Sequence, residues 1–340
     1  MPMSSGKVRV VAVGGGHGLA ATIRAVRHYA GQATAVVATA DDGGSTGRLR
    51  RGLAMPAPGD LRRCLAAMAE GAPGAGPLLD ALDFRFAGTD VEGHALGNLV
   101  LAGLAAVTGD FAAAVDEAGR LLGLDPDEAR VLPATVGPVR LCGATAAGAS
   151  VVGQVRVSST PGIERVWLVP EPPGPDAGTA AGGANGAHVA AGVAAGLGDA
   201  ARGVGGTGEA ALSAPPGVVA ALAVADQIVL GPGSLYSSVL SAAVVDEVRD
   251  AVAASAAQRV YVCNLRAEAV ETRGYDVAAH IDALRRHGIE PDVVVVQRGT
   301  IPYGDVRAKL VEADVARPHG LAHDADRLAT TLAALATVRT

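Results

Sequence analysis

The sequence predicts an α/β protein with a doubly wound, mainly parallel sheet and a small antiparallel β lobe. Its 340 residues are enough for one large domain with a small second lobe. Hydrophobic residues make up 49% of the chain but aromatic residues only 3%, so the core must consist mainly of Ala, Val and Leu. That mix suits buried parallel strands covered by Ala-rich helices. Strand, glycine loop and helix also follow one another at the start of the chain, which is typical of a parallel sheet.

The first two units set the orientation of the predicted sheet. Residues 8–13 (VRVVAV) form a predicted buried strand that runs into a glycine loop at 14–18 and then into a helix-like stretch ending near Tyr29. A second predicted strand, 33–40, ends in the polar loop 41–48. Right-handed crossovers place both loops at the carboxyl edge of one parallel sheet, where ligands bind in Rossmann-like folds. We therefore expect a ligand site at this edge.

Later elements follow the same two patterns, apolar runs for strands and helical periodicity for helices. Asp60 is predicted to be the N-cap of a helix over 61–70. The other predicted elements are helices over 94–107, 111–122 and 325–338 and strands over 227–230, 259–263 and 293–297.

Two segments interrupt the α/β pattern of this single predicted domain, 1–340. Within residues 136–170, the β-like runs VRLCGA and SVVGQVRV flank a Gly/Ala-rich turn, and a strand-like run follows over 164–169. We predict the small antiparallel lobe here. Residues 171–216 are rich in Gly, Ala and Pro and have few large side chains. They bury too little apolar surface to offset the entropy cost of ordering, so we predict a disordered surface insertion.

Charge and composition exclude several classes of protein. The net charge of −6 leaves no global basic field for nucleic acid, although the arginines within 48–51 form a local cluster that can meet phosphates. A small anionic ligand fits better. No run of about 18 apolar residues is present, which argues against membrane insertion. The cysteines, Cys64, Cys142 and Cys263, lack Cys-x-x-Cys spacing, which argues against a disulfide framework or structural zinc and favours the reduced cytoplasm.

The first glycine loop, residues 14–18, has the features of a phosphate cradle. Its backbone N–H groups have no Cβ in the way, and they precede a helix whose N-terminus favours an anion. The dinucleotide fingerprint G-x-G-x-x-G is absent because Leu19 stands at its last position, and no Lys-Ser/Thr follows to make a Walker loop. A tight turn that needs glycine only for its geometry is the alternative. The ligand candidates here are Gly14, Gly15, Gly16, His17 and Gly18.

The polar loop at 41–48 offers carboxylates at the same edge of the sheet. Asp41 and Asp42 follow the glycine turn by roughly 20 residues, where an acidic residue contacts the ribose in nucleotide-binding folds. Either can instead hold a divalent cation against phosphates, and a solvated Asp/Gly turn is the third interpretation. Gly43, Ser45 and Arg48 in this loop are further ligand candidates.

A second glycine loop, residues 231–238 (GPGSLYSS), follows a predicted apolar strand and opens a helix. It repeats the features of the cradle and adds hydroxyl donors. The two loops are separated by more than 200 residues, yet each follows the carboxyl end of a strand, which favours two walls of one crevice over two simple turns. The candidates here are Gly231, Gly233, Ser234, Leu235 and Tyr236.

Polar residues on the predicted helices supply further candidates. His94 and Asn98 stand one helical turn apart on one face. A lone His at a helix start is more often structural, and no Ser-His-Asp order or His-x-x-x-His pair can be assembled, so we assign no proton-transfer role and no catalytic residue. Asn98 is the better ligand candidate. Arg62 and Arg63 can each pair with a phosphate or be solvated, and Arg62 is the one kept as a ligand candidate.

Five motifs together resemble a known family. They are GGGHGL at 14–19, ADDGGSTGRLR at 40–50, PGDLR at 58–62, GHALGNL at 93–99 and GPGSLYSS at 231–238. In this order they resemble the gluconeogenesis factor family of the YvcK type, bacterial proteins related to the 2-phospho-L-lactate transferases in the CofD-like superfamily. The resemblance covers most of the chain outside the Gly/Ala-rich insertion. The resemblance adds Asp60 and Asn264 to the candidate ligand residues. The sequence departs from the family pattern at Ala267-Glu268, where the family has Thr-Gln.

The resemblance implies a Rossmann-like core that binds UDP-N-acetylglucosamine, in a cytoplasmic regulator of gluconeogenic growth, cell-envelope morphogenesis and cell shape. This function requires neither catalysis nor a cofactor. The alternative is a nucleotide-dependent phospholactyl-type transferase acting on a deazaflavin-like acceptor, in which Asp41 and Asp42 would hold Mg²⁺. The missing fingerprint argues against a nicotinamide oxidoreductase. Homodimer formation and a regulatory protein partner stay open.

Overall fold

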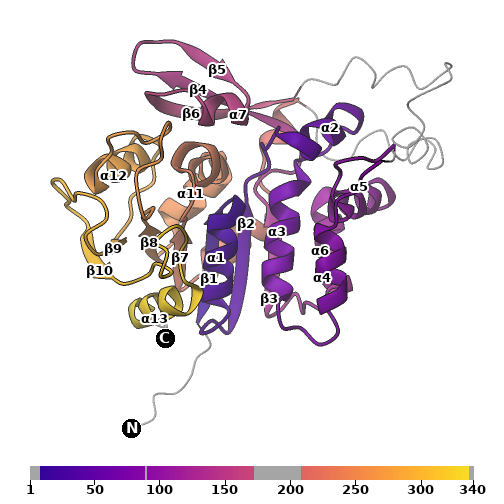
Figure 1. Ribbon diagram of the computed structural model, residues 1–340, viewed down its shortest axis with the longest axis horizontal. Coiled ribbons are helices and arrows are strands. Elements are labelled where there is room, and N and C mark those ends of the chain that lie inside the picture. Colours follow the sequence, from indigo (N-terminus) through magenta and orange to yellow (C-terminus); the bar gives the residue numbers. More distant parts are fainter. Residues whose placement is uncertain (1–7, 89, 172–207, 337–340) are drawn as a thin grey trace, which may run out of the picture.

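The computed structural model describes residues 8–88, 90–171 and 208–336. A parallel sheet of seven strands lies between two layers of helices, and a separate antiparallel sheet of three strands lies across the top of Figure 1. The predicted α/β fold class, with a doubly wound parallel sheet and a small antiparallel lobe, is confirmed. No helix within these described ranges has the length and apolar composition needed to span a membrane.

The order of the strands creates a reversal point in the large sheet. The order is β10-β9-β8-β7-β1-β2-β3, and the pairings are parallel. The chain adds β2 and β3 on one side of β1 and then builds β7 to β10 on the other side. The carboxyl ends of β1 and β7 therefore lie next to each other at a switch point, where doubly wound sheets bind ligands. The strands are β1 (Arg9–Gly14), β2 (Gln32–Val37), β3 (Ala129–Pro133), β7 (Gln227–Leu230), β8 (Gln258–Val262), β9 (Val293–Gln297) and β10 (Lys309–Ala313).

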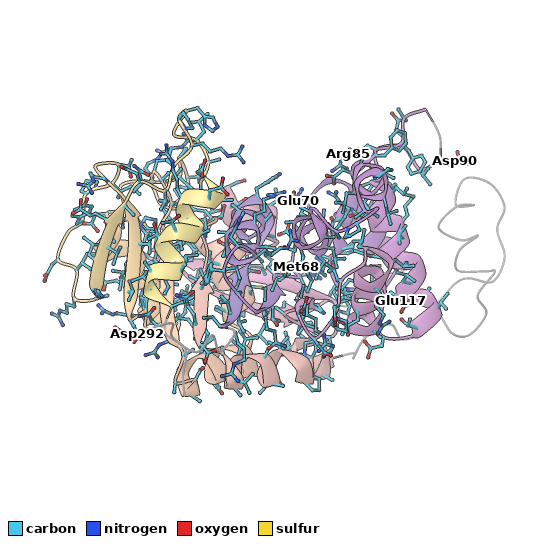
Figure 2. The ribbon with its side chains drawn as sticks, turned by 90° about the horizontal axis from the view of Figure 1, so that it is seen from below. Met68, Glu70, Arg85, Asp90, Glu117 and Asp292 are labelled. Carbon is cyan, nitrogen blue, oxygen red and sulfur yellow. The ribbon has the colours of Figure 1, made fainter. Side chains whose placement is uncertain are left out.

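The large sheet is buried on two faces, because successive residues of a strand point to opposite sides. In β1, Val10 and Ala12 pack into one core, and Val11 and Val13 pack into the other. Figure 2 shows helices on both sides of the sheet. The first core is covered by α1 (Gly16–Val26), α3 (Pro58–Ala69), α5 (Leu96–Thr108), α6 (Phe111–Leu121) and α13 (Ala325–Leu335). The second core is covered by α9 (Pro216–Val224), α11 (Asp246–Ala254), α12 (Val277–Arg286) and the π-helical segment η3 (Leu235–Leu240), which continues into α10 (Ser241–Ala243).

The antiparallel lobe lies over the carboxyl edge of the large sheet (Figure 1). Its inner face packs into the second core through side chains such as Leu141 and Ile163. The predicted strand-like run SVVGQVRV is wrong in its second half, because residues from Gln154 onward form a helix. Asp42 accepts hydrogen bonds from the backbone N–H groups at the start of this helix and so favours it over a strand. The lobe consists of β4 (Val139–Thr145), β5 (Ser150–Val152), α7 (Gln154–Ser158) and β6 (Ile163–Pro170), with strand order β5-β4-β6.

The prediction that Asp60 caps its helix is wrong. Helix α3 begins at Pro58, and Ala57 occupies the N-cap position, so Asp60 lies in the first turn. Proline suits the first helical position because its missing N–H would be unpaired there anyway. An acidic side chain in the first turn is stabilised by the positive end of the helix dipole. The prediction also missed β3, β10 and the helices α2 (Gly44–Gly52) and α4 (Gly76–Asp83).

Most of the predicted insertion, 171–216, lies outside the described residues, which resume at Gly208. The described end of this segment is ordered. Gly208–Leu212 form a 3-10 helix, and Ala211 is only 1% exposed. The Gly137 N–H donates a hydrogen bond to the Ala211 carbonyl and so joins this helix to the start of the lobe. The predicted insertion is therefore too long at its C-terminal end.

Candidate ligand-binding cleft

The two glycine loops pack directly against each other at the switch point. A Cβ atom on Gly18 would lie 2.1 Å from the Pro232 carbonyl oxygen and 2.9 Å from Gly233 Cα, so only glycine permits this approach. The Thr22 hydroxyl of α1 donates a hydrogen bond of 2.6 Å to the Gly231 carbonyl. Helix α1 is thereby joined to the second loop, and the two glycine loops, predicted as the two walls of one crevice, are in contact.

A cleft of about 390 Å³ opens beside this contact, a size typical of small-molecule sites. Its lining comes from both glycine loops, from the loop after β2, from α3, from α7 and from the segment after β8. The predicted ligand residues that line it are Gly15, Gly16, His17, Gly18, Asp41, Asp60, Gly233 and Ser234. Arg63, which the sequence offered with Arg62 as a phosphate partner but which was not kept as a ligand candidate, also lines the cleft. The lining residues that the prediction missed are Gln154, Ser238 and Glu268.

Asp60 and Arg63 form the polar base of the first wall. The Gly16 N–H donates to Asp60 Oδ2 at 2.8 Å, and Arg63 Nη1 donates to Asp60 Oδ1 at 2.6 Å. Burial raises the pKa of Asp60, the charge of Arg63 opposes this shift, and the nearby carboxylate of Asp41 adds to it. The pair therefore fixes the Arg63 guanidinium beside the first glycine loop.

Arg62 and Asn98, both predicted as ligand residues, lie in a buried polar network instead of the cleft lining. Arg62 Nε donates to Asn98 Oδ1 at 3.1 Å, and Asn98 Nδ2 donates to the Ser45 hydroxyl at 3.3 Å. That hydroxyl is 3.0 Å from His94 Nδ1. Arg62 also pairs with Asp83. The network joins α2, α3 and α5.

Side chains from the segment after β8 hold the second wall in place. The Gly233 N–H donates to Asn264 Oδ1 at 3.0 Å, and the Ser234 hydroxyl donates to Glu268 Oε1 at 2.8 Å. The Tyr236 N–H donates to Glu271 Oε2 at 3.0 Å. Asn264 thus contacts the loop itself, at the edge of the predicted ligand site.

Leu235 and Tyr236, predicted as ligand residues, are fully buried in the second core. The Tyr236 hydroxyl is 2.9 Å from the Tyr275 hydroxyl. Glu271, which caps this stretch, is only 3% exposed. Burial raises its pKa to about 7, and the charge of Glu268 contributes to that rise.

The adjacent carboxylates Asp41 and Asp42 face different partners. Asp41 lines the cleft, and one of its oxygens accepts from the Gly43 N–H at 3.0 Å. The two oxygens of Asp42 accept from the N–H groups of Gln154 and Val155, each at 3.0 Å. Asp42 therefore joins the loop after β2 to the antiparallel lobe, and its proposed contacts with a ribose or a metal stay predictions.

Two arginines of α2, Arg48 and Arg50, form hydrogen bonds within the protein. Arg48 donates to the Glu92 carbonyl at 2.8 Å. Arg50 is buried, donates to the Asp41 carbonyl at 2.9 Å and also contacts Glu171 after β6. The prediction that Arg48 contacts a ligand has no counterpart in the cleft lining.

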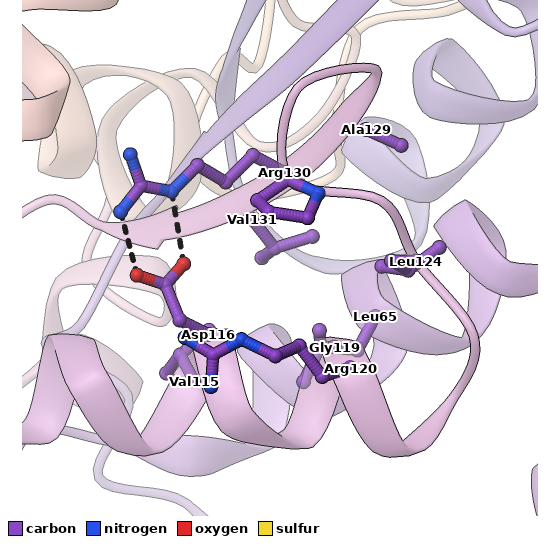
Figure 3. A pocket seen from close by; sticks show the side chains of 10 residues that line it. Leu65, Val115, Asp116, Gly119, Arg120, Leu124, Ala129, Arg130 and Val131 are labelled. Carbon is purple, nitrogen blue, oxygen red and sulfur yellow. Dashed lines mark hydrogen bonds and ion pairs between the residues drawn. The ribbon is translucent and has the colours of Figure 1, made fainter.

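Other hollows are weaker candidates for a ligand site. The pocket in Figure 3, between α6 and β3, holds only about 10 Å³, room for about one water molecule. Its polar groups are already paired, since the Arg130 guanidinium donates to the Asp116 carboxylate at 2.9 and 2.5 Å. A larger hollow beside Arg24 and His28 lies at the far end of α1, and Arg24 pairs there with Glu70. Neither hollow contains a glycine loop.

Comparison with known proteins identifies the family. Residues 10–337 match the family described as 2-phospho-L-lactate transferase CofD. The chain belongs to the CofD family. A relative from Mycobacterium tuberculosis is 36% identical over 347 aligned residues, which cover 95% of this chain and 89% of that relative. A Bacillus subtilis relative named gluconeogenesis factor is 33% identical, with 92% of this chain and 85% of the relative covered.

A solved structure supports the same conclusion for this CofD-family chain. The crystal structure of a protein from Bacillus halodurans matches it with a TM-score of 0.78 and 29% sequence identity, covering 97% of this chain and 99% of that one. The predicted membership of the gluconeogenesis factor family, within the CofD-like superfamily, is confirmed.

Proposed function

We propose that this CofD-family chain is a regulator that binds a UDP-sugar, UDP-N-acetylglucosamine first, in the cleft beside the glycine loops. The observation that supports this best is the direct contact of the two loops at the switch point, where Gly18 meets Gly233. The name of the Bacillus subtilis relative favours a role in growth on gluconeogenic carbon sources. We extend the proposal to cell-envelope morphogenesis and to a cytoplasmic location.

The first glycine loop suits the diphosphate of such a ligand. It precedes α1, an 11-residue helix without an acidic side chain in its own first turn, and the Asp60 carboxylate that accepts the Gly16 N–H at this helix end is paired with Arg63. Arg63 adds a full positive charge from α3. Loop amides and a guanidinium together would hold a diphosphate without a metal ion.

The remaining charges of the cleft favour hydroxyl groups over additional phosphates. Asp41, Asp60 and Glu268 all line the cleft. Asp60 is paired with Arg63, while burial lowers the pKa of His17 and so favours its neutral form. Ribose and sugar hydroxyls can donate to the other two carboxylates, whereas a phosphate would be repelled by them.

A second candidate function is the nucleotide-dependent transferase named by the family description. It is favoured by Asp41 and Asp60, which face the same cleft closely enough for the charge of Asp41 to raise the pKa of Asp60. Among the described residues, no group of three or more His, Cys, Asp or Glu could hold a metal. Two carboxylates nevertheless suit Mg²⁺ that arrives with nucleotide phosphates, where it would neutralise their charge.

Native mass spectrometry of the purified protein distinguishes the two candidates. The protein is sprayed with UDP-N-acetylglucosamine, GDP or ATP, after dialysis against EDTA and again with Mg²⁺ restored. Retention of the UDP-sugar in EDTA supports the regulator. Retention only with Mg²⁺, together with metal-dependent release of UMP or GMP, contradicts the regulator and supports the transferase.

A further inference from the structure

The carboxylate of Glu268 has a fixed position in the cleft. Its Oε1 accepts the Ser234 hydroxyl hydrogen bond at 2.8 Å, and its own backbone N–H donates to the Thr272 hydroxyl at 2.8 Å. Both the side chain and the backbone are therefore held before any ligand binds. Because a carboxylate has several lone pairs, Glu268 can accept a further hydrogen bond while it keeps the one from Ser234.

The charged groups divide the cleft into two ends. At the first glycine loop, the Gly16 N–H donates to Asp60, which in turn accepts from the Arg63 guanidinium. At the second loop, the Ser234 hydroxyl donates to the Glu268 carboxylate. The Arg63 guanidinium therefore lies at the first-loop end of the cleft, and the Glu268 carboxylate, a hydrogen-bond acceptor, lies at the second-loop end.

We propose that Glu268 is a specificity-determining residue, which accepts a hydrogen bond from a hydroxyl of the glycosyl group and excludes nucleotide sugars that carry a carboxylate there. The inference rests on the proposed function, since it assumes that the diphosphate lies at the first loop beside Arg63. A neutral sugar then extends toward Glu268 and Ser234 at the second loop. A hydroxyl group gains a charge-assisted hydrogen bond, whereas a second carboxylate meets a like charge.

UDP-glucose and UDP-glucuronate test this directly, because the hydroxymethyl group of UDP-glucose is replaced by a carboxylate in UDP-glucuronate and the two ligands are otherwise identical. Their dissociation constants, and that of UDP, are measured by isothermal titration for the wild type and for Glu268→Gln. The amide keeps the shape of the side chain and an oxygen for Ser234. Glu117→Gln on α6, which makes the same chemical change at a residue that does not line the cleft, is the matched control, and melting curves confirm that each variant is folded.

The wild type and Glu117→Gln should bind UDP-glucose at least about tenfold more tightly than UDP-glucuronate, and Glu268→Gln should reduce this ratio to within about threefold. The affinity for UDP should change by less than about threefold in Glu268→Gln. An unchanged ratio in Glu268→Gln, or a loss of UDP affinity as large as that for UDP-glucose, overturns the inference alone. Failure of the wild type to bind any of the three ligands overturns the proposed function as well.

Discussion

The two glycine loops have similar sequences but use their polar groups differently. In the first loop, the Gly16 N–H donates to a carboxylate that is itself paired with Arg63. In the second loop, the backbone is held by acceptors from the segment 264–271, which contact the N–H groups of Gly233 and Tyr236. At the first loop the bound carboxylate is therefore paired with a cation, while at the second loop the neighbouring carboxylate of Glu268 accepts from the Ser234 hydroxyl. A glycine run after a strand predicts close approach of the backbone, but not which groups stay available to a ligand.

The helices that follow the loops show the same difference. The first loop leads into the regular helix α1, whose end is suited to an anion. The second leads into the π-helical segment η3, whose first N–H groups are already bound by the buried carboxylate of Glu271. An anion at η3 would compete with Glu271, whereas the Asp60 carboxylate at the start of α1 is paired with Arg63, so we place the phosphates at α1.

Gly18→Ala should have the largest effect, because it breaks the contact between the two loops. The new methyl group would lie 2.1 Å from the Pro232 carbonyl oxygen, which is backbone and cannot rotate away. We expect a loss of about 3 kcal/mol or more in the free energy of unfolding, measured by urea denaturation. Gly103→Ala on α5, where a Cβ meets nothing within 4 Å, should be neutral or slightly stabilising. Equal stability of the two variants would show that the loops are not in contact.

Glu271→Gln tests the buried carboxylate that holds η3. The pKa of Glu271 is raised to about 7 in the fold, above the ordinary value of 4.5, so the native state prefers the protonated form. Wild-type stability should therefore fall as the pH rises from about 4.5 through about 7. Glu271→Gln removes this dependence and should be more stable than the wild type at pH 8 by roughly 1 to 3 kcal/mol, with little difference at pH 5. Parallel curves of melting temperature against pH would contradict this assignment.

Arg63→Gln tests the cation beside the first loop. Loss of a charge-assisted hydrogen bond to the diphosphate should weaken UDP binding by about tenfold or more, and the wild-type affinity should fall with added salt. Arg120→Gln, on the surface of α6, serves as the control for a lost arginine charge. Titration calorimetry at two salt concentrations measures both effects. An unchanged affinity in Arg63→Gln would move the diphosphate away from α1.

Asp42→Asn should have the smallest effect, because its carboxylate holds α7 of the lobe instead of lining the cleft. We expect a loss of about 1 kcal/mol in unfolding free energy and less than about a threefold change in UDP affinity. Thermal unfolding and titration of the same protein measure both quantities. A tenfold or greater loss of affinity with unchanged stability would favour the ribose contact that the sequence suggests.

The backbone of the site was predictable from the sequence, because glycine-rich segments after apolar strands mark the carboxyl edge of a parallel sheet. The outermost strands were not predictable. In β3, Arg130 is half-buried and paired with Asp116, and the strand ends in Pro133. In β10, Lys309 and Glu312 are exposed. Edge strands lack the continuous apolar run of central strands, so periodicity does not distinguish them from loops.

The side chains of the site were only partly predictable. Arg62 and Arg63 are adjacent, and which one faces the cleft depends on the rotation of α3, which tertiary packing decides. Asp41 and Asp42 are also adjacent, and only the packed structure shows that Asp41 lines the cleft while Asp42 binds the start of α7. Glu268 reaches the cleft through a contact with a residue 34 positions away, Ser234, which no local pattern encodes. Placing side chains in the cleft therefore required the packed structure.

Thermal unfolding with three ligands tests the central claim, that a phosphate anchor lies at the first glycine loop. The melting temperature should rise with UDP-N-acetylglucosamine and with UDP, because each binds the native state, and it should not move with free N-acetylglucosamine. At 100 times the dissociation constant, the expected stabilisation is about 2.7 kcal/mol. Equal stabilisation by the free sugar, or no shift with either nucleotide, would contradict the account.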